Sequence, residues 1–167
     1  MCGNLPFGAP AACVSCVEAK CCSQMKGCAS DTECVALRTC GGKPGCSSGP
    51  CWQQCKVDHA EGLPEMNVFS ACMAHECTAE CAMPASLVCG VTIQDAACAT
   101  CAQAQCCAEM YAASQSSGYW VWTQCYSGCG TDTVCMQKCD ADHPAGSALY
   151  LTYGNCLLQQ CWTECGS

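Results

Sequence analysis

The sequence predicts an all-α protein of two tandem four-helix repeats, cross-linked by disulfides around a small aliphatic core. Three observations favour this fold: 26 of the 167 residues are cysteine, the cysteine spacing repeats along the chain, and strand-forming residues are scarce and do not alternate. Leu, Ile, Val and Phe together supply only 20 residues. Because so small a core offsets chain entropy poorly, sulfur cross-links are expected to hold the fold.

The cysteine positions of the first half recur in the second half. One block repeats at an offset of 85 residues and the next at an offset of 84. The aligned positions are Cys13/Cys98, Cys16/Cys101, Cys21/Cys106, Cys22/Cys107 and Cys40/Cys125, then Cys51/Cys135, Cys55/Cys139, His59/His143, Cys72/Cys156, Cys77/Cys161 and Cys81/Cys165. After small gaps, Cys2 and Cys46 align with Cys89 and Cys129. We interpret the pattern as a tandem duplication with domains at 1–84 and 85–167.

Each repeat is expected to form four short helices. Alanine, glutamine and glutamate favour helix, and cysteine spacings of three and four residues place the sulfurs on one helix face. Ser30 and Glu33 resemble a capping box, and Pro50 and Pro64 suit the first turns of helices. The expected helices are 11–27, 31–41, 50–59 and 64–82, then 96–112, 117–127, 132–142 and 147–165.

The two repeats differ by one pair of cysteines. Cys28 and Cys34 align with Ala113 and Tyr119. Two cysteines that are present together in one copy and absent together in the other indicate a bonded pair, so we predict a Cys28–Cys34 disulfide. A rival local alignment of "CASDTEC" with "CGTDTVC" is outweighed by the downstream C-x3-C-x3-H pattern. The other pairings stay open at this stage, although adjacent cysteines are expected to bond to different partners.

Three chemical states of the cysteines are possible. Thirteen disulfides would use all 26 cysteines, with an even number in each repeat, and would imply a compartment outside the cytosol. Reduced thiolates would instead suit Cu(I) storage, because soft thiolates select soft metals. Thioredoxin-like catalysis fits poorly, since its C-x2-C motif follows a strand. Disulfides are favoured, and no metal or other cofactor is expected.

Charge and motif content exclude several classes of function. The net charge of −8 disfavours nucleic acid, and no apolar run is long enough for a membrane span. No catalytic triad or carboxylate pair follows from the spacing, so we expect no enzyme activity. His59 and His143 are expected at helix C-termini, where a partial positive charge suits the helix dipole.

The start of the chain bears on its compartment. "MCGNLPFGAP" lacks the basic and apolar regions of a signal peptide. Either the protein is cytosolic or Met1 is an added start residue on a mature, trimmed chain, and the second alternative is favoured. Cys2 is expected to be bridged, because the repeat aligns it with Cys89.

Aromatic residues concentrate in the second repeat. "GYWVWTQC", residues 118–125, contains Tyr119, Trp120 and Trp122. These side chains either fill a core that the missing bridge would have stiffened or form a platform for a sugar, a peptide or another partner. Trp120 and Trp122 lie on different faces of a helix, so at least one is expected to be exposed.

Two stretches, "CWQQCKVDHAEG" and "CMQKCDADHPAG", resemble uncharacterised cysteine-rich repeat proteins and lipoproteins exported by some Gram-negative bacteria. The resemblance implies export and a helical disulfide fold, and no activity. We therefore predict a secreted, periplasmic or cell-surface structural or binding module that is not catalytic, with a protein or carbohydrate partner. A Cu(I)-thiolate storage protein and a secreted effector or toxin-like protein are the alternatives.

Overall fold

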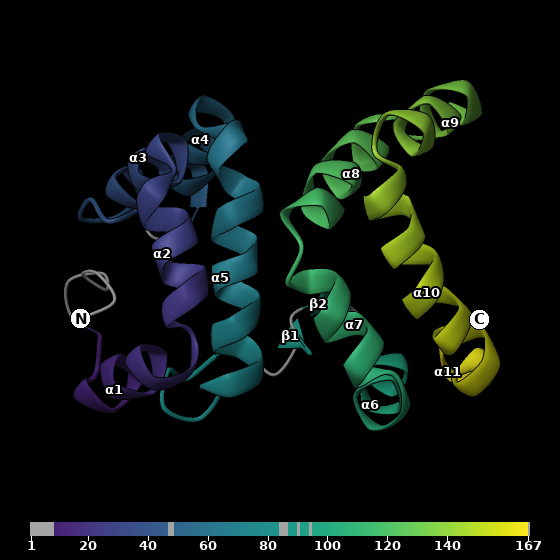
Figure 1. Ribbon diagram of the computed structural model, residues 1–167, viewed down its shortest axis with the longest axis horizontal. Helices are drawn as coiled ribbons and strands as arrows, with labels where there is room; N and C mark the ends of the chain where they lie inside the picture. The colour runs from purple at the N-terminus through teal and green to yellow at the C-terminus, as the bar shows by residue number, and fades with distance from the viewer. Residues whose placement is uncertain (1–8, 47–48, 84–86, 90, 94, 167) are drawn as a thin grey trace. The chain divides into compact units, whose positions relative to one another are not determined.

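The computed structural model describes residues 9–46, 49–83, 87–89, 91–93 and 95–166 (Figure 1). The predicted all-α class is confirmed: these ranges contain eleven α-helices, one 3-10 turn and a single two-residue antiparallel strand pair. The chain divides into two compact units, Met1–Met83 and Pro84–Ser167, here called unit 1 and unit 2. This division falls one residue before the boundary expected from the repeat, and each unit is described by itself.

Unit 1 is built on two helices that lie side by side. Helix α2 packs along α5, while α3 packs against α4 and the 3-10 turn η1 (Figure 1). The elements are α1 (Ala11–Lys20), α2 (Cys22–Ser30), α3 (Thr32–Gly41), α4 (Gly49–Asp58), η1 (Ala60–Gly62) and α5 (Leu63–Glu76).

Unit 2 has the same order of helices after a short strand pair. Helix α10 packs against α7 and α8, and α9 packs against α8 and α10. The elements are β1 (Leu87–Val88), β2 (Val91–Thr92), α6 (Ala96–Gln105), α7 (Cys107–Ser114), α8 (Ser117–Gly128), α9 (Thr133–Asp142), α10 (Pro144–Gln160) and α11 (Trp162–Cys165).

The expectation of four helices in each repeat is wrong, because cysteines break the longer ones. The helices expected at 11–27 and 96–112 bend at Cys21 and Cys106, where the backbone leaves helical geometry (φ −113° and −123°). In unit 2 the adjacent Cys106 and Cys107 bond to different elements, Cys156 and Cys89. Neighbours on a continuous helix point about 100° apart, so the bend lets each sulfur reach its partner.

The same bend recurs at the C-terminal ends of both units. Cys77 and Cys161 have φ of −129° and −130°, so α5 ends at Glu76 and the helix expected at 147–165 splits into α10 and α11. The helical backbone hydrogen bonds continue through the bend at Cys161. The Cys161 N–H donates to the Leu157 carbonyl at 2.8 Å, and the Cys161 carbonyl accepts from the Cys165 N–H at 2.8 Å.

Aspartates cap α3, α6 and α9, and the predicted capping box at Ser30 does not form. Asp31, not Ser30, caps α3: its carboxylate accepts a hydrogen bond from the Cys34 N–H at 2.7 Å. Helix α2 runs through Ser30, whose hydroxyl donates to the Gly27 carbonyl instead. The expectation for Pro64 is confirmed, since it lies in the first turn of α5.

Disulfides hold both units together. Cys22 is also disulfide-bonded, no described cysteine is free, and Cys2 lies outside the described residues. The twelve bonds between described residues are Cys13–Cys81, Cys16–Cys77, Cys21–Cys72, Cys28–Cys34, Cys40–Cys55 and Cys46–Cys51 in unit 1, and Cys89–Cys107, Cys98–Cys165, Cys101–Cys161, Cys106–Cys156, Cys125–Cys139 and Cys129–Cys135 in unit 2.

The pairing follows the aligned positions of the two repeats. Five bonds of unit 1 join cysteines that align with five bonded pairs of unit 2. The bond expected between Cys28 and Cys34 is present, with the two Cα atoms 5.3 Å apart. The tandem duplication stays a prediction, and equal pairing is what a duplication would produce.

The buried interior is small and rich in sulfur. Met25, Leu37, Met110 and Val17 are the largest fully buried side chains, and cysteines follow them in size. Disulfides that join helices from distant parts of the sequence, such as Cys13–Cys81, therefore stabilise the fold where the apolar core is small.

Candidate docking surface

The structure separates the three aromatic residues that the sequence suggests as a binding platform. Tyr119 and Trp122 are each only 3% exposed and lie in a buried cluster with Ala113. Trp120 is half-buried, and its indole N–H donates to the Ser114 carbonyl at 2.9 Å. Tyr119 and Trp122 thus belong to the core, because α8 packs against both α9 and α10. The sequence predicts that at least one of Trp120 and Trp122 is exposed; Trp122 is buried and Trp120 is half-buried.

An aromatic network joins α8 to α10. The ring centroids of Trp122 and Tyr150 lie 4.7 Å apart, those of Tyr119 and Tyr153 lie 6.1 Å apart, and Tyr150 meets Tyr153 edge to face. Such pairs add to stability beyond the apolar area that they bury. The network extends from the buried Tyr119 to Tyr150 at the surface of α10, so it positions that helix.

Covalent and polar contacts also hold α10. Cys156 bonds to Cys106, between α6 and α7, and Cys161, directly after α10, bonds to Cys101 within α6. At the N-terminal end, the Ser147 hydroxyl donates to the Asp140 carboxylate at 2.8 Å, and the same oxygen accepts from the Trp122 indole N–H. A helix tied in this way presents its outer face as a rigid surface.

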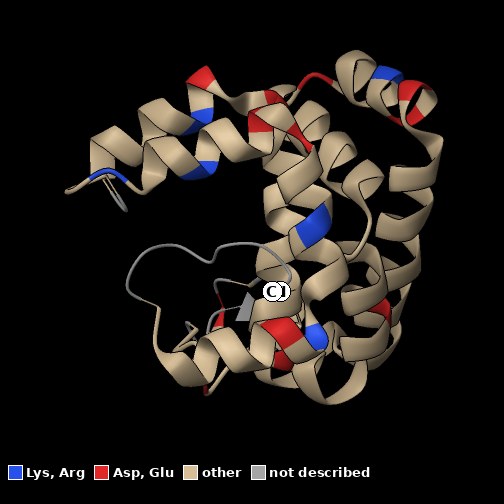
Figure 2. Ribbon diagram, turned by 60° about the vertical axis from the view of Figure 1, so that its left-hand side comes forward, with Lys and Arg blue, Asp and Glu red and all other residues tan. Residues whose placement is uncertain are grey.

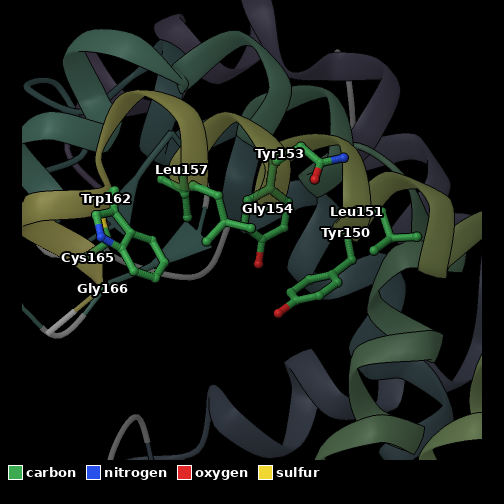
Figure 3. Close-up of a pocket in the computed structure, with 10 residues that line it drawn as sticks. Tyr150, Leu151, Tyr153, Gly154, Leu157, Trp162, Cys165 and Gly166 are labelled. Atoms are coloured by element: carbon green, nitrogen blue, oxygen red, sulfur yellow. The ribbon is translucent and has the colours of Figure 1, made fainter.

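The outer side of α10 and α11 contains a hollow of about 280 Å³. Figure 3 shows Tyr150 and Trp162 projecting at its two ends, with Leu157 between them. The lining residues are Tyr150, Leu151, Tyr153, Gly154, Asn155, Leu157, Leu158, Trp162, Cys165 and Gly166. We call the four exposed apolar side chains of this region the α10 face: Tyr150, Leu151, Leu158 and Trp162.

The α10 face is large, apolar and without charge. Leu151, Leu158 and Trp162 are 56%, 57% and 62% exposed. Helix α10 contains no Asp, Glu, Lys or Arg, so no part of it is drawn red or blue in Figure 2. Burial raises the pKa of Tyr153, which lines the hollow, by disfavouring the charged phenolate.

The aligned face of unit 1 has a different composition. At the positions of Leu151, Leu158 and Trp162, unit 1 has Asn67, Ala74 and Thr78. The sequence reasoning missed the α10 face, because apolar residues at helical spacing are typical of a core. One feature of the sequence indicates the α10 face: at these aligned positions unit 2 has large apolar residues where unit 1 has polar or small ones.

Unit 1 has a hollow of its own, of about 250 Å³, beside Trp52, Met66 and Phe69. Arg38 also lines it, and burial lowers the pKa of this guanidinium. The two units therefore differ in the chemistry of their hollows: a cation lies at the one in unit 1, whereas the lining of the one in unit 2 is uncharged.

Two groups of sulfur atoms have the closeness that a metal site needs. The sulfurs of Cys40, Cys46 and Cys55 lie within 4.8 Å of one another, as do those of Cys129, Cys135 and Cys139. All six are in disulfides, and a metal needs thiolates. These groups would suit a soft metal ion only after reduction.

The histidines lie where the sequence places them. His59 follows directly after α4, and its Nδ1 lies 3.0 Å from a carboxylate oxygen of Glu33. His143 follows directly after α9. Both positions are helix C-termini, as expected from the dipole.

Comparison with known proteins gives no relative: the chain matches no protein family, no curated protein and no solved structure. Within the described ranges, no helix has the length and apolar character that crossing a bilayer requires. Function is therefore inferred from the geometry of the units themselves.

Proposed function

We propose that this protein is an exported, non-catalytic binding module that docks a protein partner through the α10 face. The observation that supports this proposal most strongly is the set of large apolar side chains exposed on the uncharged helix α10 and, at Trp162, on the adjoining α11. Single exposed apolar residues are common on protein surfaces, but a contiguous group around a hollow indicates binding. At three of the four aligned positions unit 1 has the smaller or more polar Asn67, Ala74 and Thr78, so unit 1 folds without an equivalent face.

The disulfides support export. The protein is disulfide-rich, and such bonds persist outside the reducing cytosol. Each bond can contribute about 2–4 kcal/mol by restricting the unfolded chain, although bonds that share loops do not add simply. A small binding module exposed to heat and proteases would benefit from this scaffold.

A protein partner fits the hollow better than a carbohydrate. Sugar hydroxyls lose water on binding and need many polar partners in return. Most of the lining is apolar: the side-chain polar groups are those of Tyr150, Tyr153, Asn155 and Trp162. The Tyr153 hydroxyl already lies 3.4 Å from that of Tyr119. Apolar side chains from a protein would fill the hollow at a lower cost of desolvation.

A test uses the residues of unit 1 as replacements. The triple variant Leu151→Asn, Leu158→Ala and Trp162→Thr gives α10 and α11 the side chains found at the aligned positions of unit 1. The neutral dye Nile red and a random peptide display library are the probes. We expect the intact protein to bind the dye and to enrich amphipathic peptides, and the triple variant to lose both.

A matched control and a second set of ligands make the test decisive. Val134→Asn changes a side chain that is 74% exposed on α9, away from the α10 face, and should leave binding unchanged. Equal dye and peptide binding by the triple variant and this control would overturn the proposal. Binding to a glycan array that the triple variant loses would replace the protein partner by a carbohydrate.

The Cu(I)-storage alternative is supported only by the two groups of neighbouring sulfurs. It requires these cysteines to be thiols in the natively produced protein. Cu(I) titration of that protein, with no added reductant, tests it: tight binding of several ions would favour storage over the disulfide scaffold.

A further inference from the structure

We propose that the partner on the α10 face is the α10 face of a second copy of this chain. The two copies would form a two-fold symmetric dimer in which the two α10 helices cross in opposite directions at Gly154. This inference rests on the proposed function, because it names the partner of the same surface.

Gly154 is the first observation that carries the inference. It lies in the interior of the 17-residue helix α10 and lines the hollow. Glycine costs about 0.5–1 kcal/mol relative to alanine in a helix interior. A Cβ atom placed on Gly154 would have no atom within 4 Å, so the packing of this chain does not require a glycine there. Close approach of another backbone would require it, and unit 1 has Ser70 at the aligned position.

The arrangement of side chains around Gly154 is self-complementary. Leu151 precedes it by three residues and Leu158 follows it by four. In an antiparallel crossing at Gly154, Leu151 of one copy meets Leu158 of the other, and the two-fold axis repeats the contact. The two leucines lie about 10 Å apart along the helix, given a rise of about 1.5 Å per residue. Tyr150 and Trp162 would cover the flanks of this contact.

Charge restricts where two copies can meet. The protein has a net charge of −8, so two copies repel each other over most of their surfaces. Helix α10 carries no charged residue, so a crossing centred on Gly154 brings uncharged side chains together, whereas Glu164 lies on α11 beyond the crossing. Salt screens the repulsion between exposed charges, so it should strengthen this dimer.

Sedimentation velocity over a concentration range tests the inference. From about 1 μM to about 1 mM, a range that spans moderate to weak affinity, we expect the mass of the intact chain to rise from 17.4 kDa towards twice that value. Sodium chloride should lower the concentration at which half of the protein is dimeric.

The variant Gly154→Leu separates the crossing from the apolar surface. Leucine favours helix and adds apolar area, so the fold and Nile red binding should persist, while the side chain blocks the approach of a second helix. Gly128→Leu is the matched control on α8, because a Cβ there also meets no atom within 4 Å. We expect Gly154→Leu and the triple variant to stay monomeric and Gly128→Leu to dimerise.

Two results would overturn the dimer. If Gly154→Leu dimerises as well as the intact chain, the crossing at Gly154 is wrong. If the intact chain stays monomeric over the whole range, self-association is wrong; Nile red and peptide binding at the α10 face would then leave the proposed function standing, and their absence would overturn that proposal too.

Discussion

At one pair of aligned positions, unit 1 has a disulfide and unit 2 has packed apolar side chains. In unit 1, the Cys28–Cys34 bond ties the end of α2 to the start of α3. In unit 2 the aligned residues are Ala113 and Tyr119, which are 0% and 3% exposed and lie in one buried cluster. A short-range bridge and a buried aromatic ring have comparable value, about 2 kcal/mol in each case. Packing can therefore replace a cross-link at this corner of the fold.

The replacement has a consequence for α10. A disulfide joins only two residues, whereas a buried ring can contact several. Tyr119 contacts Tyr153, Trp122 and Trp120, and it is therefore part of the aromatic network that holds α10. The same unit carries the α10 face, with Leu151 and Trp162 where unit 1 has Asn67 and Thr78. Under the proposed function, unit 1 serves as scaffold and unit 2 supplies the binding surface.

The largest effect is expected from Trp122→Ala, which removes the ring that contacts Tyr126 and Tyr150. The free energy of unfolding should fall by about 3–5 kcal/mol, as for other buried tryptophans. Urea denaturation with the disulfides intact measures it. Trp162→Ala, at a side chain that is 62% exposed, should cost less than about 0.5 kcal/mol. Equal losses would show that Trp122 is not a core residue.

A pair of glycines sharpens the comparison between the units. A Cβ on Gly62 would overlap the backbone of Glu33 and Cys34, and one on Gly146 would overlap Gly118 and Trp122. Alanine at either position should therefore cost about 1–3 kcal/mol by overpacking. Thermal and urea denaturation should give similar losses for Gly62→Ala and Gly146→Ala. A loss in one unit only would contradict the equivalence of the two repeats.

Removal of the extra bridge should have a smaller effect. The double variant Cys28→Ala and Cys34→Ala opens a loop of only six residues, for which chain entropy gives about 2 kcal/mol. Trp52 is the only tryptophan of unit 1, and its fluorescence during urea denaturation reports this unit. Val35→Ala, at an exposed position of α3, is the control. No change beyond that of the control would mean that the bridge is redundant.

The smallest effect concerns pH. Burial raises the pKa of Tyr119 and Tyr153 above the ordinary 10.0 by disfavouring the charged phenolate. The contribution to stability is complete below pH 10 and is lost as the pH rises through the folded pKa, because the unfolded chain releases these protons first. In a titration to high pH, tyrosinate absorbance should rise in an early step from exposed tyrosines and a late step from buried ones. The Tyr153→Phe variant should lose the contribution of one tyrosine from the late step. Loss from the early step instead would contradict burial of this hydroxyl.

Part of the fold follows from the sequence, because comparison of the two halves identifies one bonded pair of cysteines and residue spacing indicates helices. The joint absence of cysteines at Ala113 and Tyr119 identified the Cys28–Cys34 bond, and helical spacing identified the all-α class. The bends at Cys21 and Cys106 did not follow, because they depend on which partners the adjacent cysteines reach. Those partners are set by long-range packing that no local pattern records.

The candidate site could be predicted only in part. The sequence located the aromatic residues in unit 2 and left open whether they fill a core or form a platform, and the structure places Tyr119 and Trp122 in the core. Leu151 and Leu158 have the spacing of a core face, and their exposure depends on what covers α10. Their replacement by Asn67 and Ala74 in the other copy was the only local signal.

The central claim is that the cysteines of the natively produced protein are disulfides. The most direct test is its intact mass before and after reduction, with alkylation under denaturing conditions. We expect no alkylation before reduction, a gain of two hydrogen atoms for each of thirteen bridges on reduction, and alkylation of all 26 cysteines afterwards. Full alkylation without reduction, once any metal has been chelated, would contradict the scaffold and turn attention to Cu(I) binding.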